Sequence, residues 1–247
     1  MLQRVYGFRK DVNFKHDFET ITKVDGITLP PKWSLVQDMP PVYDQGSIGS
    51  CTANALSGAI QFIEKAKSVP SRLFLYYNER ALQGSTQQDS GSTIGTGITA
   101  LINWGICNEI LWPYETKDLF IKPDAQAYDQ SKKDILQSFT QLTNLDTIKE
   151  SIYKGYPVAF GFQVYEYMES AAMARSGILR LPQPGEKLLG GHAILAVGYD
   201  DTTEMIKIRN SWGADWGQQG YFDMPYKYIQ DPDLASDFWA INKMEIP

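Results

Sequence analysis

Cysteine and histidine are scarce in this chain, with only two residues of each among 247. If Cys51 serves as a reactive thiol, Cys107 has no partner, and the fold contains no disulfide. The absence of a disulfide favours a reducing compartment such as the cytoplasm, although a domain of this size could also be exported without a stabilising disulfide. Two cysteines and two distant histidines do not match the ligand spacing of a zinc site. We therefore expect no metal and no cofactor.

Long apolar runs and blocks of positive charge are also missing. No stretch approaches the roughly 18–20 apolar residues that span a bilayer, and residues 1–11 lack the apolar centre of a signal peptide. The net charge is −6 and Lys and Arg are dispersed, which leaves no electrostatic footprint for nucleic acid. We expect neither a membrane nor a nucleic acid among the partners. His16 lies in a polar leader, residues 1–28, and is expected to be solvent-exposed.

The remaining pattern predicts helices in the front half and strands in the back half. A helical period begins at Cys51, with Ser50 as its expected N-cap. Further helices are expected over 72–82, 98–104 and 144–154, and strands over 157–162, 193–199, 205–209 and 238–241. Helices followed by strands indicate an α+β fold with a helical lobe, mainly 45–130, and a β-rich lobe, mainly 131–247.

Four polar residues in three separate segments form a set suited to acyl transfer. Cys51 opens a helix, where the dipole favours the thiolate, and His192 precedes a predicted strand. Asn210 can accept a hydrogen bond from the imidazole ring and hold its orientation. Gln45 can donate its amide to a developing oxyanion, beside the backbone N–H of Cys51. This set predicts a resting ion pair between a Cys51 thiolate and a protonated imidazole.

Each residue also has a structural interpretation. Cys51 could be a buried structural thiol, His192 a satisfied core histidine, and Asn210 part of an ordinary turn beside packed tryptophans. The occurrence of all of them at this spacing favours the catalytic interpretation. Cys107 is expected to be a small buried hydrophobe.

The segments 41–62, 190–199 and 210–221 resemble those around the active site of the papain-like cysteine peptidases, the papain/cathepsin family. This resemblance implies a papain-like fold over residues 29–247, with the active site in a cleft between a helical lobe and a β-barrel-like lobe. It also implies that Cys51, His192, Asn210 and Gln45 are catalytic. Substrate-binding residues follow from the same resemblance: Gly91, Ser92, Ile94, Gly191 and Trp212.

Several positions depart from the family pattern. Ile48 stands where the family often has a disulfide-forming cysteine. Thr52 replaces the aromatic residue that usually follows the nucleophile, and Ser92 replaces the second glycine of the usual substrate-binding pair. Residues 1–28 are much shorter than the usual helical prodomain, and we expect them to fold onto the body or to lie near the cleft.

The resemblance implies a thiol peptidase that forms a thioester at Cys51 and acts on peptide or protein substrates. The residues implied around the pocket for the second substrate residue before the cleaved bond (P2) are uncharged, which favours an apolar P2 residue: Thr93, Ile94, Gly161, Gly190 and Leu234. Without a pair of histidines to capture a terminal carboxylate, an endopeptidase is favoured. Cystatin-type proteins are possible inhibitors. A transpeptidase that uses the same site, or a catalytically silent binding module, remain alternatives.

Overall fold

The computed structural model describes residues 4–12, 14, 19–66 and 68–244, and it places four helices together in one lobe. These are α1 (Cys51–Ile63), α2 (Arg72–Leu82), α3 (Ile94–Trp104) and α4 (Ala125–Ser131). The N-termini of α2 and α3 are capped by the side chains of Ser71 and Thr93, which accept backbone hydrogen bonds from Phe74 and Thr96. Two helices of this lobe therefore begin at a local sequence signal.

The second lobe is built on a sheet. Along the sheet the order is β1 (Glu19–Ile21), β3 (Leu136–Leu142), β8 (Ala235–Met244), β4 (Val158–Tyr165), β5 (Leu188–Asp200), β6 (Met205–Arg209) and β7 (Tyr221–Pro225), with β2 (Lys32–Ser34) paired to β5. All pairs are antiparallel except β1 with β3. The helices of this lobe are α5 (Leu145–Tyr153), α6 (Ala171–Ser176) and α7 (Tyr226–Gln230). Elsewhere along the chain, short 3₁₀ turns cover Val36–Asp38, Thr116–Asp118, which lies between α3 and α4, and Glu166–Glu169. This confirms the expected α+β fold with two lobes.

Most of the predicted elements are present, with shifted ends. The helix expected from residue 98 begins at Ile94, because Thr93 supplies its N-cap. The strand expected from residue 193 begins at Leu188. Ser50 occupies the N-cap position of α1, as predicted. Its hydroxyl makes no cap hydrogen bond, however, and lies 2.5 Å from the hydroxyl of Tyr114.

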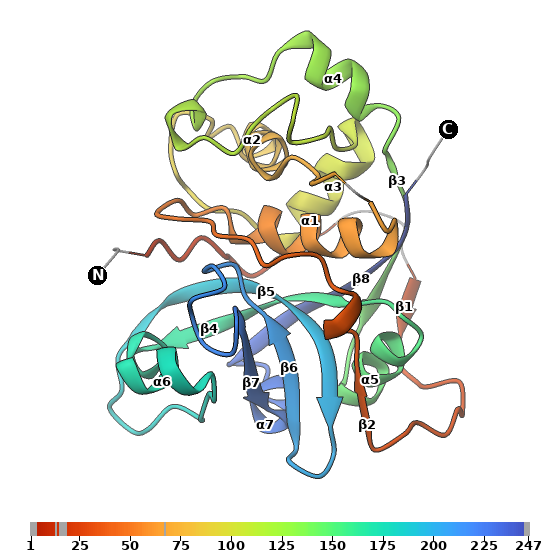
Figure 1. The fold of residues 1–247 in the computed structure, drawn as a ribbon, viewed down its shortest axis with the longest axis vertical. Coiled ribbons are helices and arrows are strands. Elements are labelled where there is room, and N and C mark those ends of the chain that lie inside the picture. Colours follow the sequence, from red (N-terminus) through yellow and green to blue (C-terminus); the bar gives the residue numbers. More distant parts are fainter. Residues whose placement is uncertain (1–3, 13, 15–18, 67, 245–247) are drawn as a thin grey trace.

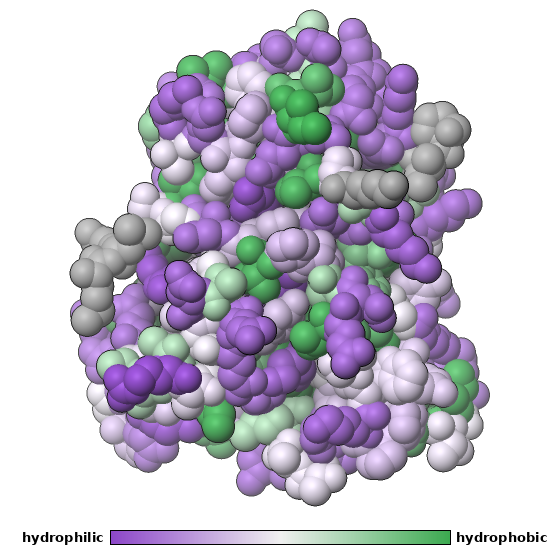
Figure 2. All heavy atoms as spheres, in the orientation of Figure 1, coloured by the Kyte–Doolittle hydropathy of each residue, from purple (hydrophilic) through white to green (hydrophobic). Residues whose placement is uncertain are grey.

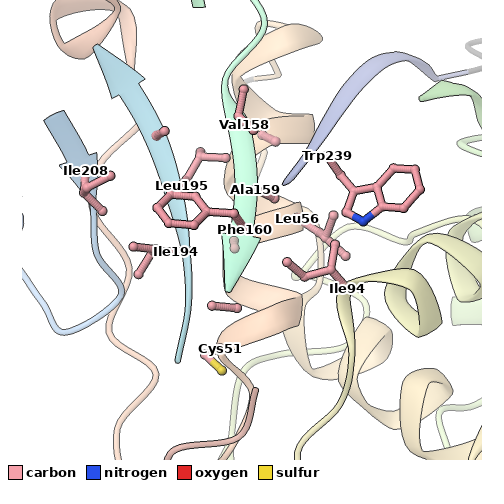
Figure 3. Close-up of a cluster of buried hydrophobic side chains, with 14 of the residues drawn as sticks. Cys51, Leu56, Ile94, Val158, Ala159, Phe160, Ile194, Leu195, Ile208 and Trp239 are labelled. Atoms are coloured by element: carbon pink, nitrogen blue, oxygen red, sulfur yellow. The ribbon is translucent and has the colours of Figure 1, made fainter. Parts of the chain in front are cut away.

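Helix α1 lies between the two lobes and forms the centre of the core. It packs against α2 and α3 on one side and against β5 and β8 on the other. Its residues from Cys51 to Gln61 are all buried. Figure 3 shows Leu56 of α1 among side chains of the sheet and of α3, with Cys51 at the end of this cluster. The first turn of α1 is thereby held where the two lobes meet.

The surface agrees with the composition of the chain. Figure 2 shows one face that is largely hydrophilic, with apolar residues in separate small patches. Among the described residues, none of the helices has both the length and the apolar character that a bilayer crossing requires.

Candidate active site

Cys51 is the first residue of α1, and its side chain has no solvent exposure. The backbone N–H groups of Ala193, Gly7 and Thr52 point at its sulfur. Ala193 directly follows His192 on β5, where residues 192–199 are buried against the core. The start of α1 and the middle of β5, far apart in the sequence, therefore meet at the sulfur atom.

His192 and Asn210 are joined by a hydrogen bond of 2.8 Å between Nε2 of the imidazole and Oδ1 of the amide. The indole of Trp212 stacks on the imidazole, with ring centroids 4.9 Å apart and an angle of 25° between the planes. Both His192 and Asn210 are buried. The other ring nitrogen, Nδ1, is buried and has no hydrogen-bond partner among the described residues. The ring is thus held at one nitrogen, while the second is left for a reacting group.

Gln45 lies in the loop before α1 and is also buried. Its Oε1 accepts a hydrogen bond of 2.6 Å from the Ser211 hydroxyl, and its Nε2 donates to the carbonyl oxygen of Ile48 at 3.0 Å. Ser211 directly follows Asn210, whose Oδ1 also accepts from the Ser211 backbone N–H. Because a primary amide carries two protons, Nε2 retains a second donor for a substrate oxygen.

The described residues 4–12 of the N-terminal leader run along the junction of the two lobes (Figure 1) and contact Trp212, His192 and Gly191. The guanidinium of Arg4 lies 3.8 Å from the centroid of the Trp212 ring. The ring of Tyr6 stands edge-on to His192, with centroids 6.4 Å apart, and its hydroxyl donates to Glu169 at 2.5 Å. The leader therefore closes the site on the side of Trp212.

Gly7 packs closely between the backbones of Gly49 and Gly91. A β-carbon on Gly7 would lie 2.0 Å from the carbonyl oxygen of Gly49, and one on Gly91 would lie 1.9 Å from the carbonyl oxygen of Gly7. The Ser92 N–H donates to that Gly7 oxygen at 2.7 Å, and the Arg9 N–H donates to the Ser92 oxygen at 2.9 Å. Only a residue without a side chain fits at this point of the leader.

Phe8 fills a pocket next to Gly7. Its side chain is buried, and a β-carbon on Gly161 would lie 1.9 Å from its ring. Its N–H donates to the carbonyl oxygen of Gly191 at 2.9 Å. An opening of about 170 Å³ continues beside Phe8, lined by Gly161, Phe162, Asp233, Leu234 and neighbouring residues.

Two carboxyl groups meet where the leader leaves the cleft. The Asp11 N–H donates to Oδ2 of Asp237 at 3.1 Å, and the Gly95 N–H donates to Oδ2 of Asp11 at 2.7 Å. Burial raises the pKa of both aspartates. Phe14 then packs on Trp239, with ring centroids 4.9 Å apart. The leader is anchored on both lobes.

The covered site does not favour an ion pair. Burial raises the pKa of Cys51 to about 12, although the three backbone N–H groups at the sulfur oppose the shift. Burial likewise lowers the pKa of His192 to about 4, against the effect of the Asn210 hydrogen bond. Both shifts favour the neutral thiol and the neutral imidazole over the ion pair. The burial of both groups therefore runs against the resting thiolate that the sequence predicted.

The residues expected to bind substrate are distributed along the leader. Gly91, Ser92, Gly191 and Trp212 contact it. Ile94 begins α3 and is fully buried in the core. Cys107 is buried with Phe74 and Ala127, away from this set. His16 lies outside the described residues.

The sequence did not identify Tyr6, Gly7 and Phe8 as residues of the site. The leader is polar and has no period, so the only available signal was the aromatic pair Tyr6 and Phe8 on either side of Gly7. As to metals, the described part of the chain contains no cluster of His, Cys, Asp or Glu that could hold an ion.

Comparison with known proteins connects this arrangement to a family. A family model described as "Papain family cysteine protease" matches residues 30–239. A peptidase C1-like protein of Acanthamoeba polyphaga mimivirus is 40% identical over 235 residues, which are 90% of this chain and 73% of that protein. Xylellain, a cysteine protease from Xylella fastidiosa, superposes with a TM-score of 0.88 at 39% identity, covering 96% of both chains.

Relatives from animals and plants are more distant. Pro-cathepsin H of Mus musculus is 29% identical over 74% of this chain, and the thiol protease aleurain of Arabidopsis thaliana is 30% identical over 82%. The matched regions span 55% and 57% of these two proteins, so this chain corresponds to little more than half of their length.

Proposed function

Because the chain belongs to the papain family of cysteine proteases, we propose that it cleaves peptide bonds within protein substrates, as an endopeptidase, through a thioester on Cys51. One observation carries this proposal. The imidazole of His192 is fixed by Asn210 under Trp212, while the N–H of the next residue, Ala193, points at the Cys51 sulfur. This geometry suits a nucleophile and a base that share one proton.

In the proposed reaction, substrate first replaces the leader. His192 takes the thiol proton, and the sulfur attacks the substrate carbonyl carbon to form a tetrahedral intermediate. The carbon–nitrogen bond then breaks as His192 returns the proton to the leaving amine, which leaves a thioester on Cys51. Water, deprotonated by His192, attacks the thioester and releases the acid and the free thiol.

The roles of the other residues follow from their contacts. Asn210 accepts the Nε2 proton of His192 and so keeps Nδ1 available for proton transfer. Trp212 covers that hydrogen bond. The free proton of the Gln45 amide and the backbone N–H of Cys51 stabilise the oxyanion. Ser211 holds the Gln45 side chain in position for this contact.

The pocket that holds Phe8 supports an apolar preference at the P2 position of substrates. Its wall at Gly161 carries no side chain, which leaves space for an aromatic ring. Leu234 borders the same space and is apolar. Asp233 also lines it, so a basic P2 residue is the alternative that peptide-library profiling must compare.

We further propose that the leader inhibits the enzyme by occupying the cleft. It places the Gly7 N–H, a hydrogen-bond donor, against the sulfur. It also uses the backbone groups of Ser92 and Gly191 that an extended substrate needs. Cystatin-type inhibitors, which we expect to bind the same cleft, would compete with the leader as well.

The activity is tested with a thiol-directed epoxide probe and a quenched peptide substrate on a Phe8→Ala parent chain, in which the leader no longer fills its pocket, and on two cysteine variants of that parent. We expect labelling and hydrolysis to be lost when Cys51→Ala is added and retained when Cys107→Ala is added, because the Cys107 thiol lies in a separate cluster. Hydrolysis by the Cys51→Ala variant at the parent rate would refute the proposed nucleophile. Transfer of the acyl group to an added amine, in preference to water, would identify a transpeptidase.

A further inference from the structure

Glu79 of α2 is a fully buried acid beside the candidate nucleophile that the proposed reaction does not use. Its Oε2 accepts a hydrogen bond of 2.7 Å from the hydroxyl of Thr52, the residue that follows Cys51. Its Oε1 is buried and has no hydrogen-bond partner in the described part of the chain. A β-carbon on Gly97 of α3 would stand 2.7 Å from Oε1. The acid is therefore enclosed between α1, α2 and α3.

Ser92 is the second polar residue beside this carboxyl: its hydroxyl opposes the rise in the pKa of Glu79 and donates a hydrogen bond of 3.3 Å to the carbonyl oxygen of Thr93. Burial raises the pKa of Glu79 to about 8, while the Thr52 and Ser92 hydroxyls and the charge of Arg80 oppose the shift. Ser92 Oγ also accepts a hydrogen bond of 2.9 Å from Gln83 Nε2. Since a carboxyl group buried in this way favours its neutral form, Glu79 carries a proton over the neutral pH range.

Thr52 and Ser92 are two of the positions at which this chain departs from the papain pattern, and both meet at Glu79. Thr52 belongs to the turn that carries Cys51. Ser92 pairs through its backbone with the extended leader at Gly7 and Arg9. One buried acid thus contacts both the nucleophile turn and the strip that holds an extended peptide.

We propose that Glu79 is a positioning residue, whose carboxyl group holds the Cys51 turn of α1 and the Ser92 strip at the spacing that hydrolysis requires. This inference rests on the proposed peptidase function. Small displacements of reacting groups are costly, because a shift of about 1 Å can reduce a rate roughly a hundredfold. The positioning acts through Thr52 and Ser92, and Glu79 itself does not touch substrate.

The state of Glu79 also affects the thiol. A negative charge on Glu79 raises the pKa of Cys51, because like charges in a buried site oppose each other. Two charged or titratable groups act with Glu79. The positive charge of Arg80 on α2 favours the carboxylate of Glu79, and that carboxylate in turn disfavours the thiolate of Cys51 on α1. Gly97 is the α3 residue against Oε1 and carries no charge. Loss of the Glu79 proton above about pH 8 therefore lowers the fraction of Cys51 that is present as the thiolate at a given pH.

The test compares Glu79→Gln, Glu79→Leu and Thr52→Val, each with Phe8→Ala in the full chain so that the leader no longer fills its pocket. Steady-state kinetics with a peptide substrate at pH 6.5 separate kcat from KM. For Glu79→Leu and Thr52→Val we expect kcat to fall about tenfold to a hundredfold. Glu79→Gln, which can still accept the Thr52 hydrogen bond, is expected to stay within about threefold of its parent.

Two controls keep this result specific. Ser57→Ala removes another buried hydroxyl of α1 that has no hydrogen-bond partner among the described residues, and its kcat is expected to remain unchanged. Thermal unfolding shows whether each variant folds. If Glu79→Leu does not fold, the kcat of Thr52→Val tests the positioning role instead. The double variant of Glu79→Leu and Thr52→Val should be no slower than Glu79→Leu alone, because both remove one contact.

The pH profile distinguishes positioning from a general structural role. From pH 7 to 9 the parent should lose kcat/KM as Glu79 ionises, and Glu79→Gln, which has no carboxyl group to ionise, should not show this loss. The alkylation rate of Cys51 by iodoacetamide, in a Cys107→Ala background, should show the same difference. Equal profiles, or a kcat of Glu79→Leu within twofold of the parent, would overturn the proposal. Alkylation reports on Glu79 even if the chain hydrolyses no peptide, so the two proposals fail separately.

Discussion

The N–H of Phe8 donates a hydrogen bond of 2.9 Å to the carbonyl oxygen of Gly191, the residue immediately before His192. A segment from the extreme N-terminus is thereby attached to the strand that carries the candidate base. The Phe8 ring is buried over Gly161. The same contact that would orient a substrate beside the imidazole is used by the chain itself.

Replacing Phe8 by alanine should raise peptidase activity. The ring is 5% exposed, and burial of a phenylalanine side chain stabilises the bound state by roughly 1.5–3 kcal/mol. Its loss should increase the population of the open cleft about tenfold to a hundredfold, and initial hydrolysis rates of a peptide substrate measure this. Val12→Ala is the matched control, because Val12 belongs to the leader but is 90% exposed. Equal rates for all three chains would show that the leader does not inhibit.

Exposing Cys51 should also change its titration. Burial under the leader holds the pKa of Cys51 at about 12 and that of His192 at about 4. Rehydration lowers the thiol pKa and raises the imidazole pKa, so the ion pair becomes accessible near neutral pH. The rate of alkylation by iodoacetamide at pH 6–7 should therefore be higher in Phe8→Ala than in the wild type, with Cys107→Ala in both chains. If the alkylation rate had the same pH dependence in Phe8→Ala and in the wild type, this account would be contradicted.

Removing the Gln45 amide should slow hydrolysis without preventing formation of the thiolate. The loss of one oxyanion donor typically reduces kcat by about 10²–10³, so Gln45→Ala is expected in that range. Ser211→Ala removes only the hydroxyl that holds Gln45 Oε1 and should cost less. The order of the two effects, measured by steady-state kinetics in the Phe8→Ala background, checks the proposed role. A larger loss in Ser211→Ala would assign the main role to Ser211.

Glu79 should make the stability of the chain depend on pH. Its pKa is raised by burial from 4.5 to about 8 in the folded chain. A raised folded pKa means that stability is fully present below the unfolded pKa and is lost as the pH rises through the window from about 4.5 to 8. Denaturant unfolding of the wild type should lose on the order of a few kcal/mol across this window relative to Glu79→Gln. Parallel curves for the two chains would show that Glu79 ionises without cost.

Much of the fold and of the active-site set could be predicted from the sequence, since local signals mark them. The period that begins at Cys51 marks α1, and Ser71 precedes α2. Helix α3 was predicted from residue 98 and begins at Ile94, because the cap at Thr93 was not recognised. The strands predicted over 193–199 and 205–209 lie within β5 and β6, joined as an antiparallel pair. The pairing of His192 with Asn210 was expected from the resemblance of their segments to those of the papain family, and the structure has it.

The contacts that required the structure are long-range. Strand β3 has no regular alternation, with the burial pattern of Leu136–Leu142 set by its pairing with β8 and not by its own residues. The path of the leader depends on the missing side chains at Gly7, Gly49 and Gly91, which no period in the sequence reveals. The burial that opposes the resting ion pair was missed for the same reason, because the sequence does not show what covers Cys51.

The zero exposure of Cys51 in the covered chain has a chemical consequence apart from catalysis. Oxidation of a cysteine to sulfenic acid needs both a thiolate and access for the oxidant, and the leader withholds the two together. The covered chain therefore keeps the Cys51 thiol reduced. Peroxide can oxidise this thiol only after the leader has left the cleft, which is also the state in which the enzyme can bind substrate.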